Sequence, residues 1–250
     1  MKKRIDILLV ERGLAESRQK AQALLLAGQV LAAEQKVEKP GRMVDADVPI
    51  RLLAKLPYAS RAGGKLQAAL DHFRISVTGR VCADLGASTG GFTDCLLQRG
   101  AREVHAFDVG KGLLDWKLRS DRRVKVHDEY NVRHILATDL PDELFLVTVD
   151  LSFISLTKVL APLINALKLK CADQTVDLVL LVKPQFEVGK GEVGKGGIVR
   201  DGDKRSAALD RVERHAVGLG FVSNGFIPSP IRGTKGNAEF LLYLRFDPGL

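Results

Sequence analysis

A chain of 250 residues is long enough for one large domain, or for a small and a medium one. Hydrophobic residues make up 46% and charged residues 27%, which is ordinary for a folded protein and excludes a mostly disordered or collagen-like chain. The 38 basic residues against 30 acidic ones leave a net charge of +8. This excess favours a polyanionic partner, most commonly nucleic acid.

The sequence shows no sign of export, membrane insertion or metal binding. No apolar run approaches the roughly 18 residues of a membrane span, and charged residues interrupt the basic start before an export signal can form. The 3 cysteines have neither the density of a disulfide framework nor the spacing of metal ligands. The 5 histidines form no paired-ligand motif. We therefore expect a cytoplasmic protein without a bound metal.

Residues 1–59 predict a small α+β domain. Apolar residues at helical spacing indicate two helices, the second beginning at the N-cap residue Ser17 and ending before the left-handed terminator Gly28. Short strands are expected at 30–31, 37 and 50–53. Residues 60–65 are expected to form a linker, and residues 66–250 a second domain.

In the second domain, strand-length apolar runs alternate with amphipathic helical patterns. The expected strands are 81–85, 104–108, 124–126, 144–149, 178–182 and 240–244, and the expected helices are 92–99, 156–169 and 204–219. This alternation predicts an α/β fold with a mostly parallel, Rossmann-like sheet and helices on both faces. Ligands of such folds bind at the carboxyl ends of the strands.

A glycine loop follows the first of these strands, in the segment Asp-Leu-Gly-Ala-Ser-Thr-Gly-Gly-Phe at 84–92. It matches neither the dinucleotide pattern Gly-x-Gly-x-x-Gly nor the Walker pattern. An acid at the strand end repels a pyrophosphate and suits an ammonium, which fits the amino-acid half of S-adenosylmethionine better than NAD. The candidate cofactor-binding residues of this segment are Asp84, Gly86, Ser88, Thr89, Gly90 and Phe92.

Acids also end the next two strands. Asp108 is expected to accept hydrogen bonds from both ribose hydroxyls of the cofactor, as the corresponding acid does in dinucleotide folds. Asp128 is placed to reach the adenine amino group. A solvent-exposed turn is the alternative for either acid alone, but together with the glycine loop they indicate a cofactor site.

Two further strand ends carry charges that the cofactor does not explain. Asp150 ends one apolar strand and Lys183 ends the next, so both are expected to project into the same cleft. Their pairing is either an ion pair without a function or an active site. Lys65 and Glu239 could complete a charge-alternating set, although each alone would be taken for a surface residue.

Residues 1–59 resemble the small RNA-binding module first known from a ribosomal small-subunit protein. The matching residues are Ser17-Arg18-x-x-Ala21, Leu25, Ala27-Gly28-x-Val30 and Val37-x-Lys39-Pro40-Gly41. The module usually has Asn-Gly in its hairpin, where this chain has Ala33-Glu34. The resemblance implies that Arg4, Arg18 and Lys20 contact RNA phosphates.

The whole chain resembles the TlyA (hemolysin A-like) family of ribosomal RNA 2′-O-methyltransferases, whose methyltransferase domain is of the FtsJ type. The matching segments are 60–65, 84–92, 131–133, 150–156, 182–187, 197–201 and 237–241. The family's Lys-Asp-Lys-Glu tetrad corresponds to Lys65, Asp150, Lys183 and Glu239. The resemblance implies S-adenosylmethionine as cofactor, ribosomal RNA or ribosomal subunits as partner, and methylation of cytidine ribose.

In this hypothesis Lys183, held by Asp150, touches the attacking ribose oxygen and stabilises its developing charge. The neighbouring Lys65 favours an uncharged amine that could act as general base, and Glu239 orients the cluster. Two other classes of function stay open at this point: a pore-forming hemolysin, which the absence of spanning segments disfavours, and a non-catalytic RNA-binding protein, which the intact tetrad disfavours.

Further basic residues could contact RNA outside the first domain. Arg61 flanks the expected linker, and the glycine-rich segment 189–197 carries Lys190 and Lys195. This segment is either a plain surface loop or a loop that orders on RNA and neutralises phosphates. Arg232 and Lys235 have the same two interpretations.

Overall fold

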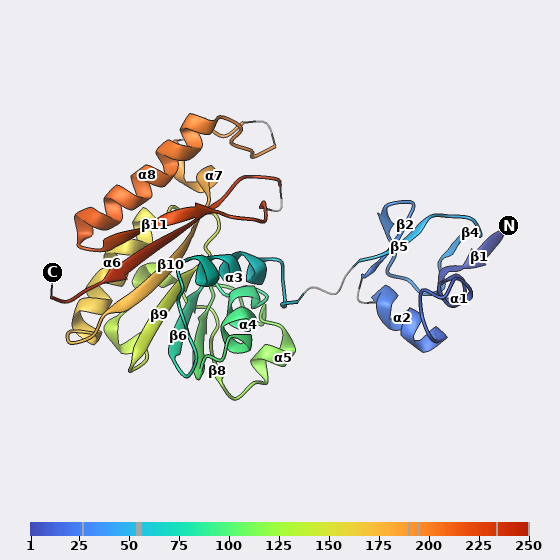
Figure 1. The fold of residues 1–250 in the computed structure, drawn as a ribbon, viewed down its shortest axis with the longest axis horizontal. Coiled ribbons are helices and arrows are strands. Elements are labelled where there is room, and N and C mark those ends of the chain that lie inside the picture. The colour runs from blue at the N-terminus through green and yellow to red at the C-terminus, as the bar shows by residue number, and fades with distance from the viewer. Residues whose placement is uncertain (27, 54–56, 190, 195, 234, 250) are drawn as a thin grey trace. The chain divides into compact units, whose positions relative to one another are not determined.

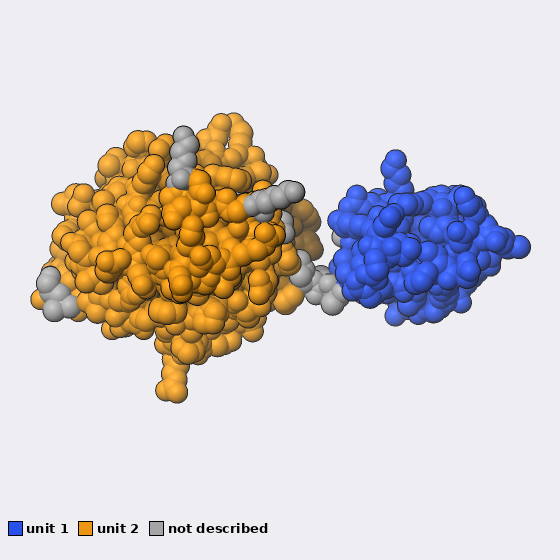
Figure 2. All heavy atoms as spheres, turned by 90° about the horizontal axis from the view of Figure 1, so that it is seen from above, with its two compact units in different colours: residues 1–56 blue, residues 57–250 orange. Residues whose placement is uncertain are grey.

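The chain folds into two units, residues 1–56 and residues 57–250 (Figure 2). The computed structural model describes the whole chain except residues 27, 54–56, 190, 195, 234 and 250. None of the helices that it describes combines the length and the apolar character of a membrane span.

The first unit is the expected small α+β domain. Its elements are β1 (Lys2–Arg4), α1 (Ile5–Glu11), α2 (Arg18–Leu26), β2 (Val30–Ala32), β3 (Gln35–Lys36), β4 (Met43–Asp45) and β5 (Ile50–Leu52). The strands form a sheet of order β3-β2-β5 and a separate β1-β4 pair. Ile5, Leu9 and Leu25 are fully buried between the helices and the sheet, so the apolar stripes of both helices form this core.

The helix cap at Ser17 and the hairpin turn at Ala33-Glu34 have the geometry expected for the RNA-binding module that the first unit resembles. The Ser17 hydroxyl accepts a hydrogen bond from the Lys20 backbone N–H at 3.2 Å, so Ser17 caps α2. The β2–β3 hairpin turns at Ala33 and Glu34, whose φ angles are 47° and 60°. Both residues therefore adopt the left-handed backbone that Asn-Gly usually supplies in a two-residue hairpin.

The second unit is the expected Rossmann-like α/β fold. Its helices are α3 (Ala62–His72), α4 (Gly91–Gln98), α5 (Trp116–Arg119), α6 (Thr157–Lys170), α7 (Pro184–Glu187) and α8 (Gly202–Leu219), with short 3-10 turns at Val132–His134 and Ala137–Asp139. Its strands are β6 (Val81–Leu85), β7 (Glu103–Phe107), β8 (Val124–His127), β9 (Leu144–Val149), β10 (Val176–Val182), β11 (Val222–Pro228) and β12 (Phe240–Phe246).

The seven strands form one sheet in the order β11-β12-β10-β9-β6-β7-β8. Strands β8, β7, β6, β9 and β10 are parallel, whereas β12 runs antiparallel to both β10 and β11. Helices cover both faces, with α3 and α4 on one side and α6 and α8 on the other (Figure 1). Every residue of β10 is buried because its side chains alternate between these two cores.

Residues 60–65 do not form the expected linker, because α3 begins at Ala62. Gly63 lies inside this helix for a packing reason. A Cβ at Gly63 would lie 2.4 Å from the side chain of Tyr58, so only glycine allows the buried tyrosine to pack against this turn. Tyr58 and the first turn of α3 are thus part of the second unit.

Candidate active site

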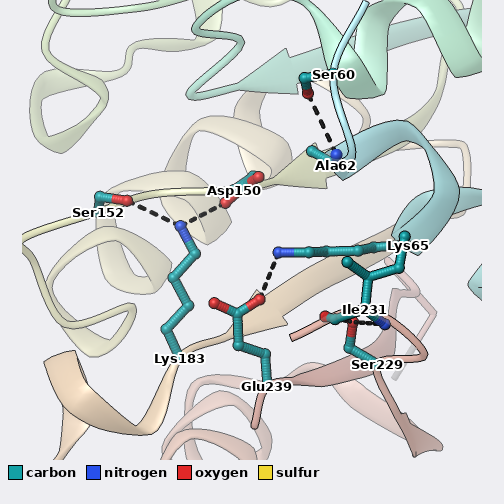
Figure 3. A network of polar contacts seen from close by, with 9 residues as sticks. All are labelled: Ser60, Ala62, Lys65, Asp150, Ser152, Lys183, Ser229, Ile231 and Glu239. Carbon is teal, nitrogen blue, oxygen red and sulfur yellow. Dashed lines mark hydrogen bonds and ion pairs between the residues drawn. The ribbon is translucent and has the colours of Figure 1, made fainter. Parts of the chain in front are cut away.

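A cavity of about 410 Å³ lies where β9 and β10 end and β12 begins. Lys65 enters it from α3, Asp150 follows β9, Lys183 follows β10, and Glu239 precedes β12. The antiparallel register pairs Val182 with Phe240 and so brings the residues next to them, Lys183 and Glu239, to the same edge of the sheet. The structure thus brings together all four tetrad residues that the sequence comparison proposed (Figure 3).

The four side chains form two ion pairs. Lys183 Nζ lies 2.6 Å from Asp150 Oδ1, and Lys65 Nζ lies 2.5 Å from Glu239 Oε2 (Figure 3). The exposed side-chain fractions are 11% and 17% in the first pair and 9% and 3% in the second. Charges this deeply buried interact strongly and are costly to separate, so each lysine is held in place by its acid.

The cavity carries an excess of positive charge. The two lysines of the tetrad are balanced by its two acids, whereas Arg61, Arg232 and Lys235 also line the cavity. Among the described residues, none of these three cations forms a salt bridge with an acid. The cavity and its rim therefore attract an anion such as an RNA phosphate.

An aromatic pair marks another part of the cavity lining. Phe153 is 91% exposed and its φ is 65°, a left-handed backbone that is unusual for a bulky residue. Its ring lies 5.2 Å from that of Phe186. An exposed phenylalanine held in a strained backbone conformation is a functional signal that the sequence analysis missed.

The glycine loop adjoins the tetrad through the backbone. Asp150 N–H donates to the carbonyl of Leu85 at 2.9 Å. A Cβ on Gly86, whose φ is 90°, would lie 2.4 Å from the carbonyl oxygen of Asp150. Only glycine permits this approach, which places the glycine loop directly beside the acid that holds Lys183.

Asp108 is a predicted cofactor residue whose carboxylate stays open to a ligand. One carboxylate oxygen accepts from Ser88 N–H and the other from Gly110 N–H, both at 2.8 Å. Each oxygen keeps a further lone pair, and the carboxylate is only partly buried. The next residue, Val109, is 67% exposed and offers an apolar surface beside the carboxylate, as an adenine would require. Ser88 and Thr89 are exposed on the same loop.

Asp84 does not have the expected contact with the methionine ammonium. Its side chain is fully buried and accepts hydrogen bonds from Thr93 at 2.7 Å and from Thr148 at 2.9 Å. Burial raises the pKa of this carboxyl to about 6, against the effect of the two hydroxyls. Asp84 therefore braces β6 against α4 and β9 beneath the loop, and it has no surface for a ligand.

Two more of the predicted cofactor contacts, Gly90 and Phe92, need correction, and Asp128 has a partner that the sequence did not suggest. Gly90 and Phe92 are buried, because Gly90 packs against the side chain of Leu118 and Phe92 belongs to the core. Asp128 Oδ2 lies 2.7 Å from Arg119 and accepts from Gly112 N–H at 3.2 Å. The arginine contact lowers the pKa of Asp128. This engages one of the two carboxylate oxygens, and the expected contact of Asp128 with adenine stays a prediction.

Two of the three predicted RNA contacts of the first unit, Arg4 and Arg18, share one unforeseen partner, Asp6. The carboxylate of Asp6 is fully buried and accepts from Arg4, Arg18 and Gln22 at 2.9–3.1 Å. The contact with Arg4 is the main cause that holds the pKa of Asp6 well below its usual range. The side chains of Arg4 and Arg18 are still 41% and 54% exposed, so each guanidinium can offer further N–H groups to a phosphate.

The other predicted RNA contacts are scattered over both units. Lys20 is exposed on α2, and Arg61 is exposed where it lines the cavity. Lys190 and Lys195 lie outside the described residues. The loop that carries them ends at Gly197, whose carbonyl accepts from the buried Asn237 side chain at 2.8 Å.

The chain matches two protein families. Residues 58–246 match the FtsJ-like methyltransferase family, and residues 3–50 match the S4 domain. The chain is 46% identical over 244 residues to the 16S/23S rRNA (cytidine-2′-O)-methyltransferase TlyA of Mycobacterium tuberculosis, which covers 97% of this chain and 89% of that protein.

Two solved structures are also similar. One, from Streptococcus thermophilus and named as a hemolysin, is 41% identical with a TM-score of 0.72, and covers 98% of this chain and 88% of the other. A Listeria monocytogenes structure named as an S-adenosylmethionine-dependent methyltransferase is 13% identical with a TM-score of 0.53, covers 75% of this chain and all of the other, and supports the fold alone. The chain belongs to the FtsJ-like methyltransferase family and carries an S4 domain ahead of its methyltransferase domain.

Proposed function

We propose that the protein transfers a methyl group from S-adenosylmethionine to the 2′-oxygen of a cytidine ribose in ribosomal RNA. The observation that carries this proposal is the cavity that holds the Lys65–Glu239 and Lys183–Asp150 ion pairs beside the glycine loop. The 46% identity to a protein named as a cytidine-2′-O-methyltransferase supports the choice of nucleotide.

The residues of the cavity suit the chemistry of a ribose hydroxyl. Bound S-adenosylmethionine supplies an electrophilic methyl carbon on a positively charged sulfur. The hydroxyl is a weak nucleophile, so the protein must hold its oxygen and assist the loss of its proton. Lys183 touches the oxygen in our proposal, Asp150 fixes the lysine, and the Lys65–Glu239 pair completes the charge balance of the cluster. Holding both reactants in place can remove about 7–11 kcal/mol of the barrier.

The rim of the cavity suits a single nucleotide of an RNA chain. Arg61, Arg232 and Lys235 offer positive charge to the flanking phosphates, which position the RNA without reading its sequence. Phe153 offers an exposed ring on which a base can stack, an interaction worth about 1–3 kcal/mol. The cofactor site would lie at the glycine loop, with Asp108 holding the ribose.

The S4 domain provides a second RNA contact in this proposal. Arg4, Arg18 and Lys20 would bind phosphates and dock the substrate, so the methyltransferase domain alone should bind cofactor but methylate ribosomal RNA poorly. The structure shows where to truncate. Gln98 donates to the carbonyl of Pro57, and Asp94 accepts from the backbone of residue 59, so the isolated domain should comprise residues 57–250.

The proposal is tested with purified full-length protein, isotopically labelled S-adenosylmethionine, and ribosomal RNA or subunits from cells that lack the gene. Mass spectrometry of the digested RNA should find the label in 2′-O-methylcytidine at defined positions. Label on a base, or no transfer to any ribosomal RNA or subunit, would contradict the proposal. A ribose label on another nucleoside would refute the cytidine assignment alone.

A further inference from the structure

One contact of Lys183 lies outside the tetrad. Its Nζ donates a hydrogen bond to the hydroxyl of Ser152 at 2.9 Å (Figure 3). Asp150 Oδ1 is closer, at 2.6 Å, but approaches outside hydrogen-bond geometry, and among the described residues this buried oxygen accepts no hydrogen bond. Asp150 thus interacts with the lysine through its charge, whereas the directional hydrogen bond to Ser152 constrains the orientation of the amine.

The orientation of the Lys183 amine needs such a constraint because a lysine amine rotates easily about its Cε–Nζ bond. Its nitrogen has three positions besides the bond to Cε, and a compact ammonium uses any of them equally well. Ser152 occupies one position and Asp150 lies against a second. The remaining position is then left for the cavity, which Lys183 and Ser152 both line.

We propose that Ser152 is a positioning residue for the methyl transfer, which fixes the rotation of the Lys183 amine so that its remaining position meets the ribose 2′-hydroxyl. This inference rests on the proposed function. In a charged Lys183 the remaining position is an N–H, which stabilises the negative charge that develops on the 2′-oxygen. In an uncharged Lys183 it is the nitrogen lone pair, which takes the hydroxyl proton while the electrons of the O–H bond stay on the oxygen. Without Ser152 the lone pair or the third N–H points toward the oxygen only part of the time.

Ser152 can be replaced without disturbing the rest of its loop. Its side chain is exposed, so a substitution leaves no internal cavity. The loop is held elsewhere by the buried carboxylate of Glu187, which accepts from the Ser155 hydroxyl at 2.6 Å and from the Leu156 N–H at 2.8 Å. Loss of the Ser152 hydroxyl should therefore affect the lysine and not the fold.

The test compares Ser152→Ala, Ser152→Val and Ser152→Thr in the full chain. Threonine keeps the hydroxyl, and valine has the shape of threonine without it. Loss of a hydrogen bond to a charged group corresponds to a rate about 10-fold lower at saturating RNA and cofactor. We expect this loss for alanine and valine with the KM for RNA within about 2-fold of wild type, and near-complete rescue by threonine.

A second measurement does not depend on activity. The amine of Lys183, identified in a ¹H–¹⁵N spectrum by its loss in Lys183→Ala, should exchange slowly with water in wild type and Ser152→Thr and rapidly in the other two variants. Wild-type rates and slow exchange in Ser152→Ala and Ser152→Val would overturn the inference. An inactive wild type would overturn the proposed function instead, and the exchange measurement would still decide whether Ser152 orients Lys183.

Discussion

Replacement of Asp84 by asparagine should make the second unit less sensitive to pH. Burial gives the Asp84 carboxyl a pKa of about 6 in the folded protein against an ordinary 3.8. Between these values the native state binds more protons than the unfolded state, so stability falls as the pH rises through this window. A difference of roughly 2 pH units corresponds to about 3 kcal/mol. Asparagine can still accept a hydrogen bond from Thr93 or Thr148 but never ionises.

The assay is urea unfolding of the full chain at several pH values between 4 and 7, with unfolding monitored by pulse labelling of the thiols. Cys82, Cys95 and Cys171 are all buried in the second unit, so their labelling reports on that unit alone. The free energy of unfolding of Asp84→Asn, minus that of wild type, should rise by about 2 kcal/mol from pH 4 to pH 7, because part of the full difference lies below pH 4. A difference that stays constant with pH would refute the assignment of Asp84 as a buried acid under the glycine loop.

Two further predictions concern the surfaces that we propose to bind RNA. Asp6→Asn should lower the stability of the first unit by about 2–3 kcal/mol, because it removes a buried charge that two arginines contact. Since these contacts depress the pKa of Asp6, the difference from wild type should be largest above about pH 4 and fade as the pH falls toward the lowered pKa, as amide exchange of α1 and α2 can measure. Arg232→Ala/Lys235→Ala should weaken RNA binding and reduce the slope of log affinity against log salt by about 1.4, the value for two lost contacts to single-stranded phosphates. An unchanged slope would mean that neither cation contacts a phosphate.

The strands of the methyltransferase domain could be predicted because burial on both faces leaves a plain sequence signal. The strand β9 begins and ends as expected, and β10 exceeds its prediction only at its start. The edge strand β11 was missed. Only one of its faces packs on the protein, a bulge interrupts its register, and Gly225 and Pro228 are atypical of a strand. Helix α3 was missed because two glycines in its first turn are atypical of a helix, and here they serve close packing.

The pairing of Lys183 with Asp150 was predictable because a charged residue directly after a buried strand needs a partner of opposite charge. Lys183 follows the buried strand β10 and Asp150 follows the neighbouring strand β9, and the two side chains form an ion pair. The roles of acids that depend on a contact between residues far apart in the sequence were not predictable. Nothing in the sequence places Asp6 under Arg4 and Arg18, or shows that the two threonines would enclose Asp84. Both acids are engaged by partners that only the tertiary fold brings close.

The proposed function requires the buried Lys183 for methyl transfer to a ribose oxygen. The most direct test measures single-turnover methylation of ribosomal RNA by Lys183→Ala, together with its affinity for S-adenosylmethionine by calorimetry. We expect the cofactor affinity to stay near the wild-type value, because Asp108 and the glycine loop are untouched, while the rate falls by about 100-fold or more. Near-wild-type methylation by a variant that binds the cofactor normally would contradict it.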